Sequence, residues 1–237
     1  MKNNLIVEDW GRIGYEEAWN LQTRHQQMLI ERKRSKGFHH TNPDGQHFLI
    51  FCEHPHVYTI GKTGSDDHLL AKKEYLQKHK ISFHHINRGG DITYHGPGQL
   101  VIYPILDLEF FFRDLHRYIR MLEEMIIRTL HDLGLEAGRR KGFTGVWTGP
   151  ETNRKICAIG VHMSRWVSMH GLAFNVNPDL SYFDQIIPCG IKDEEKTVTS
   201  IAAESGKTPD PKMVKSLVRH HFIDLFEIDH YETKQNV

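Results

Sequence analysis

The chain has 237 residues, of which 39% are hydrophobic and 25% are charged, and its 30 basic residues match its 30 acidic ones. This composition is typical of a globular protein that buries a substantial core, and the balanced charge argues against a general attraction to nucleic acid or membranes. No secretory signal or membrane span is evident and the three cysteines match no disulfide scaffold, so we expect a cytoplasmic protein.

The first part of the chain combines helical and extended patterns. Apolar residues at helical spacing predict a helix over residues 14–34. Segment 47–58 opens as a β-rich apolar run that ends at Pro55. Residues 74–79 suit a short helix, and residues 81–86 suit a short strand.

The second part contains the most regular patterns. Residues 88–108 have the glycine punctuation of a strand, a turn and a second strand. An apolar stripe predicts a helix over 113–133, with Gly134 placed to end it. A final helix starts at Pro211, and residues 232–237 are expected to fray. Between these helices lie three segments with the spacing of antiparallel hairpins: TGVWTG, KICAIGVHM and HGLAFNV.

The order of these elements favours an α+β fold. Strands are clustered rather than strictly alternating with helices, which is typical of one mixed or antiparallel central sheet flanked by helices. No internal repeat or linker divides the chain. We therefore expect a single domain over residues 1–237.

Two cysteines and one lysine raise the question of thiol chemistry. Cys189 stands in IIPCGI between two structure-breaking residues, where functional residues concentrate, although a free cysteine is more often a buried filler. Strand alternation would place Lys155, Cys157 and Ile159 on one face. A desolvated Lys155 could act as a base or stabilise a thiolate, or it could be an edge lysine that reaches water. Periodicity does not decide which cysteine would be its partner.

Glycine and polar residues suggest a ligand site within residues 88–95, just before and within the first strand of the segment 88–108. Gly89 and Gly90 would permit a ligand to approach backbone N–H groups, and Arg88 could bind phosphate or carboxylate. A plain turn with a surface arginine is the alternative. Thr93 and His95 would share one strand face and could line a polar site, unless His95 is purely structural.

The 18 histidines also raise the question of a metal site. Their spacing does not match H-E-x-x-H, and no C-x-x-C accompanies them. We therefore expect no bound metal.

Longer motifs resemble a known family. The segment RGGDITYHGPGQLVIYP resembles the signature of lipoyl(octanoyl) transferases, the octanoyl-acyl carrier protein:protein octanoyltransferases of the biotin/lipoate ligase superfamily. The resemblance continues in the family's order through EHPHVYTIGK, GVW, KICAIGVHMSRWVSMHGLAFNV, IIPCGI and TSI. It covers nearly the whole chain and implies a biotin/lipoate protein ligase-like fold.

The resemblance implies roles for particular residues. Cys189 would be the acyl-accepting nucleophile and Lys155 its partner, with no cofactor required. Cys157 departs from the family, which generally has a small residue such as alanine there. The acyl-substrate site would be formed by three segments: Arg88, Gly89, Gly90, Asp91, Ile92, Thr93, Tyr94 and His95; Ala158, Ile159 and Gly160; and Gly171, Leu172 and Ala173.

The implied reaction moves an octanoyl group from octanoyl-acyl carrier protein, through a cysteine thioester, to the target lysine of lipoyl domains. The acceptors would be lipoyl domains of 2-oxoacid dehydrogenase complexes and the glycine cleavage H protein. Arg139, Arg140, Lys141 and Lys62 could dock the acidic carrier protein, or form a solvated basic surface. The alternatives are an ATP-dependent lipoate–protein ligase on the same fold, or a non-catalytic acyl- or metal-binding protein.

Overall fold

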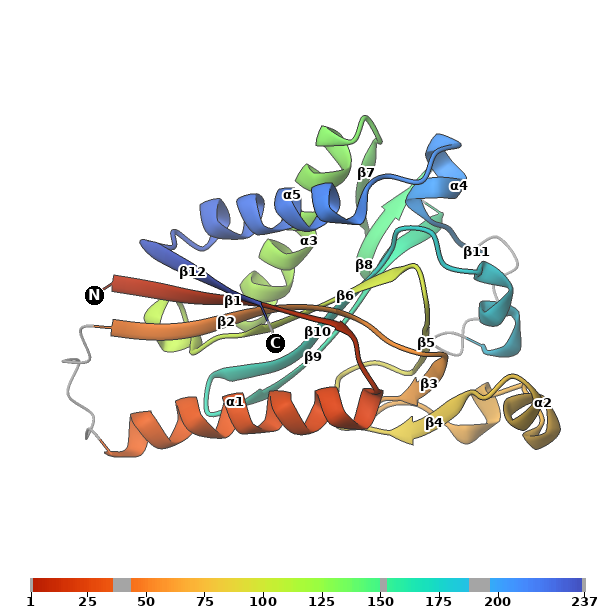
Figure 1. Cartoon of the computed structure of the whole chain (residues 1–237), viewed down its shortest axis with the longest axis horizontal. Helices are drawn as coiled ribbons and strands as arrows, with labels where there is room; N and C mark the ends of the chain where they lie inside the picture. Colours follow the sequence, from red (N-terminus) through yellow and green to blue (C-terminus); the bar gives the residue numbers. More distant parts are fainter. Residues whose placement is uncertain (1, 36–43, 150–152, 188–196, 236–237) are drawn as a thin grey trace.

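The computed structural model describes residues 2–35, 44–149, 153–187 and 197–235, which form two sheets and the helices around them (Figure 1). The helices are α1 (Tyr15–Ser35), α2 (Lys73–Lys78), α3 (Leu115–Asp132), α4 (Ile201–Ser205) and α5 (Pro211–Leu225). The strands are β1 (Lys2–Arg12), β2 (Asp44–Glu53), β3 (Val57–Ile60), β4 (Ser82–His85), β5 (Ile92–His95), β6 (Gln99–Ile105), β7 (Ala137–Arg140), β8 (Phe143–Thr148), β9 (Arg154–Ser164), β10 (Val167–Asn175), β11 (Thr197–Val198) and β12 (His230–Gln235).

The larger sheet is mixed. Its strand order is β12-β1-β2-β6-β10-β9-β8-β7, and β11 pairs in addition with β9. Strands β12, β1 and β2 run parallel to one another, whereas the pairs from β2 to β7 are antiparallel. The predicted α+β class with a mixed central sheet is therefore confirmed.

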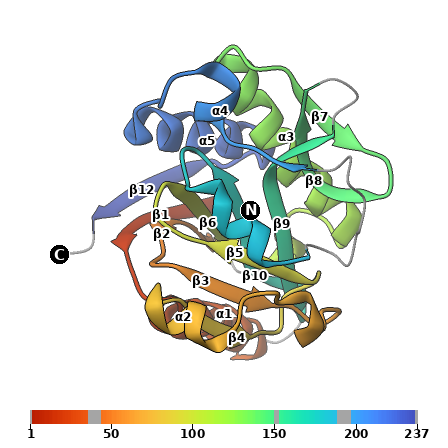
Figure 2. The same cartoon turned by 90° about the vertical axis from the view of Figure 1, so that its right-hand side faces the viewer.

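Helices cover both faces of this sheet. Figure 1 shows α1 along one side and α3 with α5 along the other, and Figure 2 shows the same layers from the end. Strand β6 illustrates how the sequence produces these layers. Leu100 and Ile102 join the core under α3 and α5, whereas Val101 and Tyr103 join the core over α1. Neighbouring residues point to opposite faces, and a strand covered on both sides is apolar at nearly every position.

The prediction of one sheet is incomplete, because a second sheet of three strands forms in the order β4-β3-β5. The strands expected on either side of the Gly96–Gly98 turn exist, but they do not pair with each other. Strand β5 pairs with β3, whereas β6 pairs with β2 and β10. The turn is held from outside, since Gly98 N donates to the Glu53 carboxylate and Asn177 N donates to Gly98 O. These contacts direct β5 and β6 into different sheets.

The four predicted helices are confirmed within one or two residues at most ends, but the chain ends differ from expectation. Residues 232–235 do not fray: they belong to β12, which pairs in parallel with the unpredicted strand β1 from Asn4↔His230 to Asp9↔Gln235. Exposed side chains on β12 explain why its sequence lacks an apolar signal. Strands β7 and β11 and the short helix α4 were also not predicted. Among the described helices, none is both long and apolar enough to cross a membrane.

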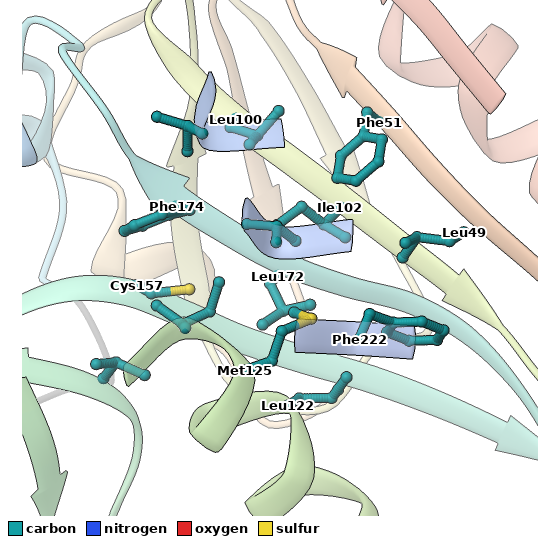
Figure 3. Close-up of a cluster of buried hydrophobic side chains, with 14 of the residues drawn as sticks. Leu49, Phe51, Leu100, Ile102, Leu122, Met125, Cys157, Leu172, Phe174 and Phe222 are labelled. Carbon is teal, nitrogen blue, oxygen red and sulfur yellow. The ribbon is translucent and has the colours of Figure 1, made fainter. Parts of the chain in front are cut away.

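We predict that Phe222→Ala strongly destabilises the fold. Phe222 on α5 is fully buried and packs among Leu172, Met125 and their neighbours (Figure 3). Removing such an aromatic ring typically costs about 3–5 kcal/mol. Met213→Ala on the same helix is the control, because Met213 is 46% exposed and should change the unfolding free energy by less than about 0.5 kcal/mol. Urea unfolding measures both; equal effects would contradict this assignment of the core.

Candidate active site

A cavity of about 580 Å³ lies on the α1 side of the large sheet, at strands β6, β10 and β9. The loop before β5 and strand β5 also line it, and it reaches the start of α3 and the turn between β7 and β8. This volume lies within the range of small-molecule sites. The cavity walls therefore come from several segments, many of them distant in the sequence.

Residues that the sequence predicted as a substrate site gather at this cavity. All of them except Tyr94 line it, and so does Lys155. Tyr94 lies on the opposite face of β5 from Thr93, where its hydroxyl bonds to His56 Nδ1 at 2.8 Å and its ring stacks on Tyr182 at 5.0 Å. Tyr94 therefore supports β5 from behind. The expected nucleophile Cys189 lies outside the described residues.

Arg88 fixes the glycine loop rather than lying on the surface. Its Nη2 donates to Thr59 O at 2.7 Å and to Thr59 Oγ1 at 2.9 Å, and its Nη1 donates to Gly89 O at 3.1 Å. Only 8% of the residue is exposed. The reading of Arg88 as a surface arginine in a plain turn is therefore wrong, because its guanidinium ties the loop to β3.

Small residues on the sheet leave open space in the cavity. Ala158 faces Ala173, and Gly160 faces Gly171 across the β9–β10 pair. The loop approaches so closely that a Cβ on Gly160 would lie 2.8 Å from Gly89 O. Gly89 N also donates to Val161 O at 2.9 Å. Larger side chains at these positions would occupy the space that a ligand needs.

A β-bulge in β9 decides the direction of Lys155. Cys157 faces Val146, yet Lys155 faces Trp147, so Ile156 is one extra residue in β9. Val146 and Trp147 point to opposite faces of β8, and their partners therefore do the same. The expectation that Lys155 and Cys157 share a face is wrong, because the extra residue cancels the alternation. Lys155 lies in the cavity wall instead.

The bulge is fixed from the partner strand. Gly145 has a φ of +120°, which other residues rarely adopt. Its N–H donates to the fully buried Glu123 carboxylate at 3.1 Å. Glu123 in turn accepts from Arg120 at 2.6 Å and from Arg139 at 3.0 Å. The buried carboxylate of Glu123 on helix α3, which is paired with two arginines, thus fixes the backbone of β8 beside the bulge.

Cys157 is an apolar core residue. It is fully buried, and Figure 3 shows its sulfur among Phe174, Leu172 and Met125. Burial raises the pKa of the Cys157 thiol, and burial likewise raises the pKa of the Cys52 thiol. A thiol with a raised pKa is a poor nucleophile, because the thiolate is the reactive form. Neither of these described cysteines is suited to accept an acyl group.

A chain of amides fixes His95 at the cavity. Its Nδ1 lies 2.8 Å from Gln99 Oε1, while Gln99 Nε2 donates to Asn175 Oδ1 and Asn175 donates to Thr199 O. Because Gln99 presents its carbonyl oxygen, His95 Nδ1 carries the proton. Burial lowers the pKa of His95 to about 3, so the ring is neutral near pH 7. His95 and its partners therefore provide polar groups without charge.

A second buried histidine, His170, also lines the cavity. Its Nε2 lies 2.7 Å from Asn87 Oδ1, and burial lowers its pKa to about 3. His54 lies next to the cavity, with Nε2 2.7 Å from the hydroxyl of the lining residue Tyr103. Across the described part of the chain, no three His, Cys, Asp or Glu side chains are grouped as metal ligands.

Sequence reasoning missed several lining residues: Tyr15, Gln99, Tyr103, His170 and Asn175. Gln99 and Asn175 had a readable signal, since both are polar side chains in otherwise apolar strands. The others depend on which strands become neighbours, which periodicity does not reveal.

Two of the basic residues proposed for docking interact with other side chains of the fold. Arg139 donates to Glu123 and to Glu124 at 2.8 Å, and Arg140 lies over the rings of Phe143 and Trp147. These contacts give two of the basic residues a role within the fold.

Buried neutral histidines predict a loss of stability in acid. Burial lowers the pKa of His47 to about 3, so below pH 6.5 the unfolded chain binds a proton there that the folded chain does not. The free energy of unfolding should therefore decrease by about 1.4 kcal/mol for each unit that the pH falls between pH ~6 and ~4, for each such histidine. Urea unfolding at several pH values should show a smaller slope for His47→Gln. The control His131→Gln changes a side chain that is 87% exposed and should leave the slope unchanged; equal slopes in all three proteins would contradict the prediction.

We also predict that Gly145→Ala is more damaging than a matched glycine substitution. A Cβ at Gly145 would lie 2.6 Å from Cys157 O and 3.6 Å from Lys155 Cε, in addition to the strain of a positive φ. We expect a loss of about 2–4 kcal/mol. Gly134→Ala has a positive φ but no atom within 4 Å of the new Cβ, so about 1 kcal/mol is expected. Urea unfolding compares them; similar losses would show that the bulge tolerates the methyl group.

Comparison with known structures shows the fold of lipoate–protein ligases. A bi-partite lipoate protein ligase from Thermoplasma acidophilum, described with its E2 lipoyl domain, aligns with a TM-score of 0.71 at 19% identity, over 100% of this chain and 88% of that one. Lipoate-protein ligase A bound with ATP aligns with a TM-score of 0.70 at 17% identity, over 100% and 90%. At these identities the likeness concerns the fold alone.

Sequence comparisons are more specific. Residues 21–223 match the lipoyl protein ligase A/B catalytic domain. An octanoyltransferase of Cytophaga hutchinsonii is 51% identical over 232 residues, covering 95% of this chain and 93% of that protein. An octanoyltransferase of Flavobacterium johnsoniae is 49% identical over 232 residues, covering 97% and 99%. With a cavity at the matched motifs and relatives this similar over nearly their whole length, the chain belongs to the octanoyltransferase family and is an acyltransferase.

Proposed function

We propose that this acyltransferase carries an octanoyl group on Cys189 as a thioester and uses Lys155 to move the protons. The observation that carries the proposal is the bulge, which turns Lys155 into the cavity wall and Cys157 away from it. Described residues on both sides of Cys189 support the choice of thiol. Phe183 before it and Val198 after it both line the same cavity.

The first step transfers the acyl group from octanoyl-acyl carrier protein to the enzyme. Lys155 accepts the thiol proton of Cys189, and the thiolate attacks the thioester carbonyl. The bond from the carbonyl carbon to the carrier sulfur breaks, and the carrier leaves as a thiol with the proton from Lys155. One thioester replaces another, so this step needs no nucleotide.

The second step forms an amide. The uncharged ε-amine of a target lysine attacks the octanoyl-Cys189 thioester, and Lys155 accepts the proton that the amine loses. The carbon–sulfur bond breaks, and the Cys189 thiolate is regenerated opposite a charged Lys155. The amide is more stable than the thioester, which makes the sequence run forward.

The cavity suits an eight-carbon chain. Apolar side chains supply much of its wall: Ile92, Val101, Ile119, Ile159, Leu172 and Phe183. Burying a methylene stabilises the bound state by about 0.8 kcal/mol, so the tail could contribute several kcal/mol. The neutral state of His95 and His170 avoids placing a buried charge beside this tail.

The proposed acceptors are lipoyl domains of 2-oxoacid dehydrogenase complexes and the glycine cleavage H protein. Support comes from the fold, because the bi-partite ligase of Thermoplasma acidophilum was described with its E2 lipoyl domain. An ATP-dependent lipoate ligase on this fold is the second candidate. Octanoyltransferase relatives at 46–51% identity favour the transferase, whereas the ligase structures share 17–19%.

Acylation by octanoyl-acyl carrier protein without ATP tests the proposal. Intact-mass measurement should show one octanoyl adduct, and tandem mass spectrometry should place it on Cys189. Cys157→Ala should be acylated at the wild-type rate, Cys189→Ala should not be acylated, and Lys155→Ala should react at least about 100-fold more slowly.

Transfer to a lipoyl domain is measured in the same mixture after addition of the acceptor. Chelators should not change either step. Strict dependence on ATP would identify a ligase instead. An adduct on Cys157 that persists in Cys189→Ala would overturn the choice of nucleophile.

A further inference from the structure

We infer that Trp147 is a positioning residue that holds Lys155 at the cavity wall and favours its charged form through the indole face. The inference rests on the proposed function, because Lys155 must be the group that moves protons. It concerns a side chain that does not line the cavity itself and that acts only through the lysine.

The contact follows directly from the bulge. Trp147 is the cross-strand partner of Lys155, and Lys155 Nζ lies 4.7 Å from the centroid of the indole ring. Ammonium groups within about 6 Å of an aromatic face are attracted by its negative potential, most strongly at tryptophan. Without the extra residue Ile156, Lys155 would point to the other face of the sheet and lose this contact.

The burial of Trp147 strengthens the case for a role of its ring face. Only 3% of the residue is exposed. A buried indole N–H usually has a hydrogen-bond partner, yet Nε1 of Trp147 has none among the described residues. The indole therefore gains nothing from its polar edge here, and its contribution comes from the ring face and from packing.

A second cation shares the ring. Arg140 Cζ lies 5.6 Å from the Trp147 centroid and 5.6 Å from that of Phe143. The two cations on Trp147 repel each other, and both draw on the same ring. Trp147 and Arg140 therefore act on the charge of Lys155 in opposite directions.

Other charged and titratable groups surround Lys155 on the neighbouring elements. Glu123 on α3 reaches the backbone of Gly145, whose Cβ position is 3.6 Å from Lys155 Cε, but its carboxylate is already paired with two arginines. Cys157 on β9 is uncharged, because burial raises the pKa of its thiol. Arg154, the preceding residue, forms two 2.8 Å bonds with Glu204. Of these described neighbours, the indole and Arg140 can be replaced to alter the charge environment of Lys155 without breaking a buried ion pair.

The sign of the effect follows from the chemistry. In the second step Lys155 must be neutral to accept the proton of the amine, so the rate rises with pH as Lys155 loses its proton. The indole stabilises the ammonium. Replacing Trp147 with an aliphatic residue should therefore move the midpoint of this rise to lower pH, by about one unit.

Deacylation of the octanoyl-enzyme by hydroxylamine isolates this step, because hydroxylamine stays uncharged over the pH range of interest. Trp147→Leu should shift the midpoint down by about one pH unit and lower the plateau rate, since Lys155 is no longer held. Trp147→Phe keeps an aromatic face and should return the midpoint most of the way to the wild-type value. Thermal unfolding of each variant separates this shift from a loss of folded protein.

Arg140→Gln provides a test with the opposite sign. Removing the competing cation should move the midpoint to higher pH. A variant that acted only by loosening the structure would lower the rate at all pH values without shifting the midpoint in either direction. Should Trp147→Leu fail to fold, Arg140→Gln still tests the inference, because an unchanged midpoint in that variant would overturn it.

The outcomes separate this inference from the proposed function. If the wild-type protein forms no octanoyl adduct on Cys189, the proposed function fails. If the adduct forms and Lys155→Ala abolishes the pH dependence, but the Trp147 and Arg140 variants leave the midpoint unchanged, the role of the indole is overturned and the dyad remains.

Discussion

One extra residue in β9 is the constraint on which the site depends. Because Ile156 has no partner on β8, the residues before and after it point to opposite faces of the sheet. This separates an amine that belongs at the cavity from a thiol that belongs in the core. The sheet accommodates the irregularity because Gly145 adopts a positive φ and its N–H donates to the Glu123 carboxylate. A local irregularity in pairing thus turns the amine that we propose for catalysis to one side of the sheet and a core residue to the other.

Desolvation sets the electrostatic character of the cavity. Its histidines are held neutral by burial, and Arg88 is bonded to protein oxygens at its edge. With these histidines uncharged, no buried imidazolium lies beside the apolar part of the wall, which is compatible with the long uncharged acyl chain that we propose as its occupant. The same burial makes the fold less stable in acid, because each of these histidines binds a proton more readily in the unfolded chain than in the folded one.

Much of the fold could be read from the sequence, for identifiable reasons. Helix α3 is amphipathic over five turns, and strands β8, β9 and β10 follow one another with hairpin spacing. Local periodicity was therefore enough to predict these elements. The position of Lys155 relative to Cys157 could not be read in this way. Alternation assumes a regular strand, whereas the bulge depends on a glycine φ and on a carboxylate from another helix. The predicted substrate-site residues came from ordered motifs, and the cavity brings together segments that periodicity alone would not connect.

The pairing of β12 with β1 has a consequence for how the chain folds. Asn4 faces His230, so β1 gains its outer partner in the nine-stranded sheet only when residues more than 200 positions apart have met. Such contacts form late, because a long loop must be closed before they give any stabilisation. Until then β1 presents an open edge, with β2 as its partner on the other side. During synthesis on the ribosome, the apolar strand β1 would therefore be the edge of the sheet until β12, whose side chains are exposed, emerges and replaces it as the edge strand. This is the stage at which aggregation would compete with folding.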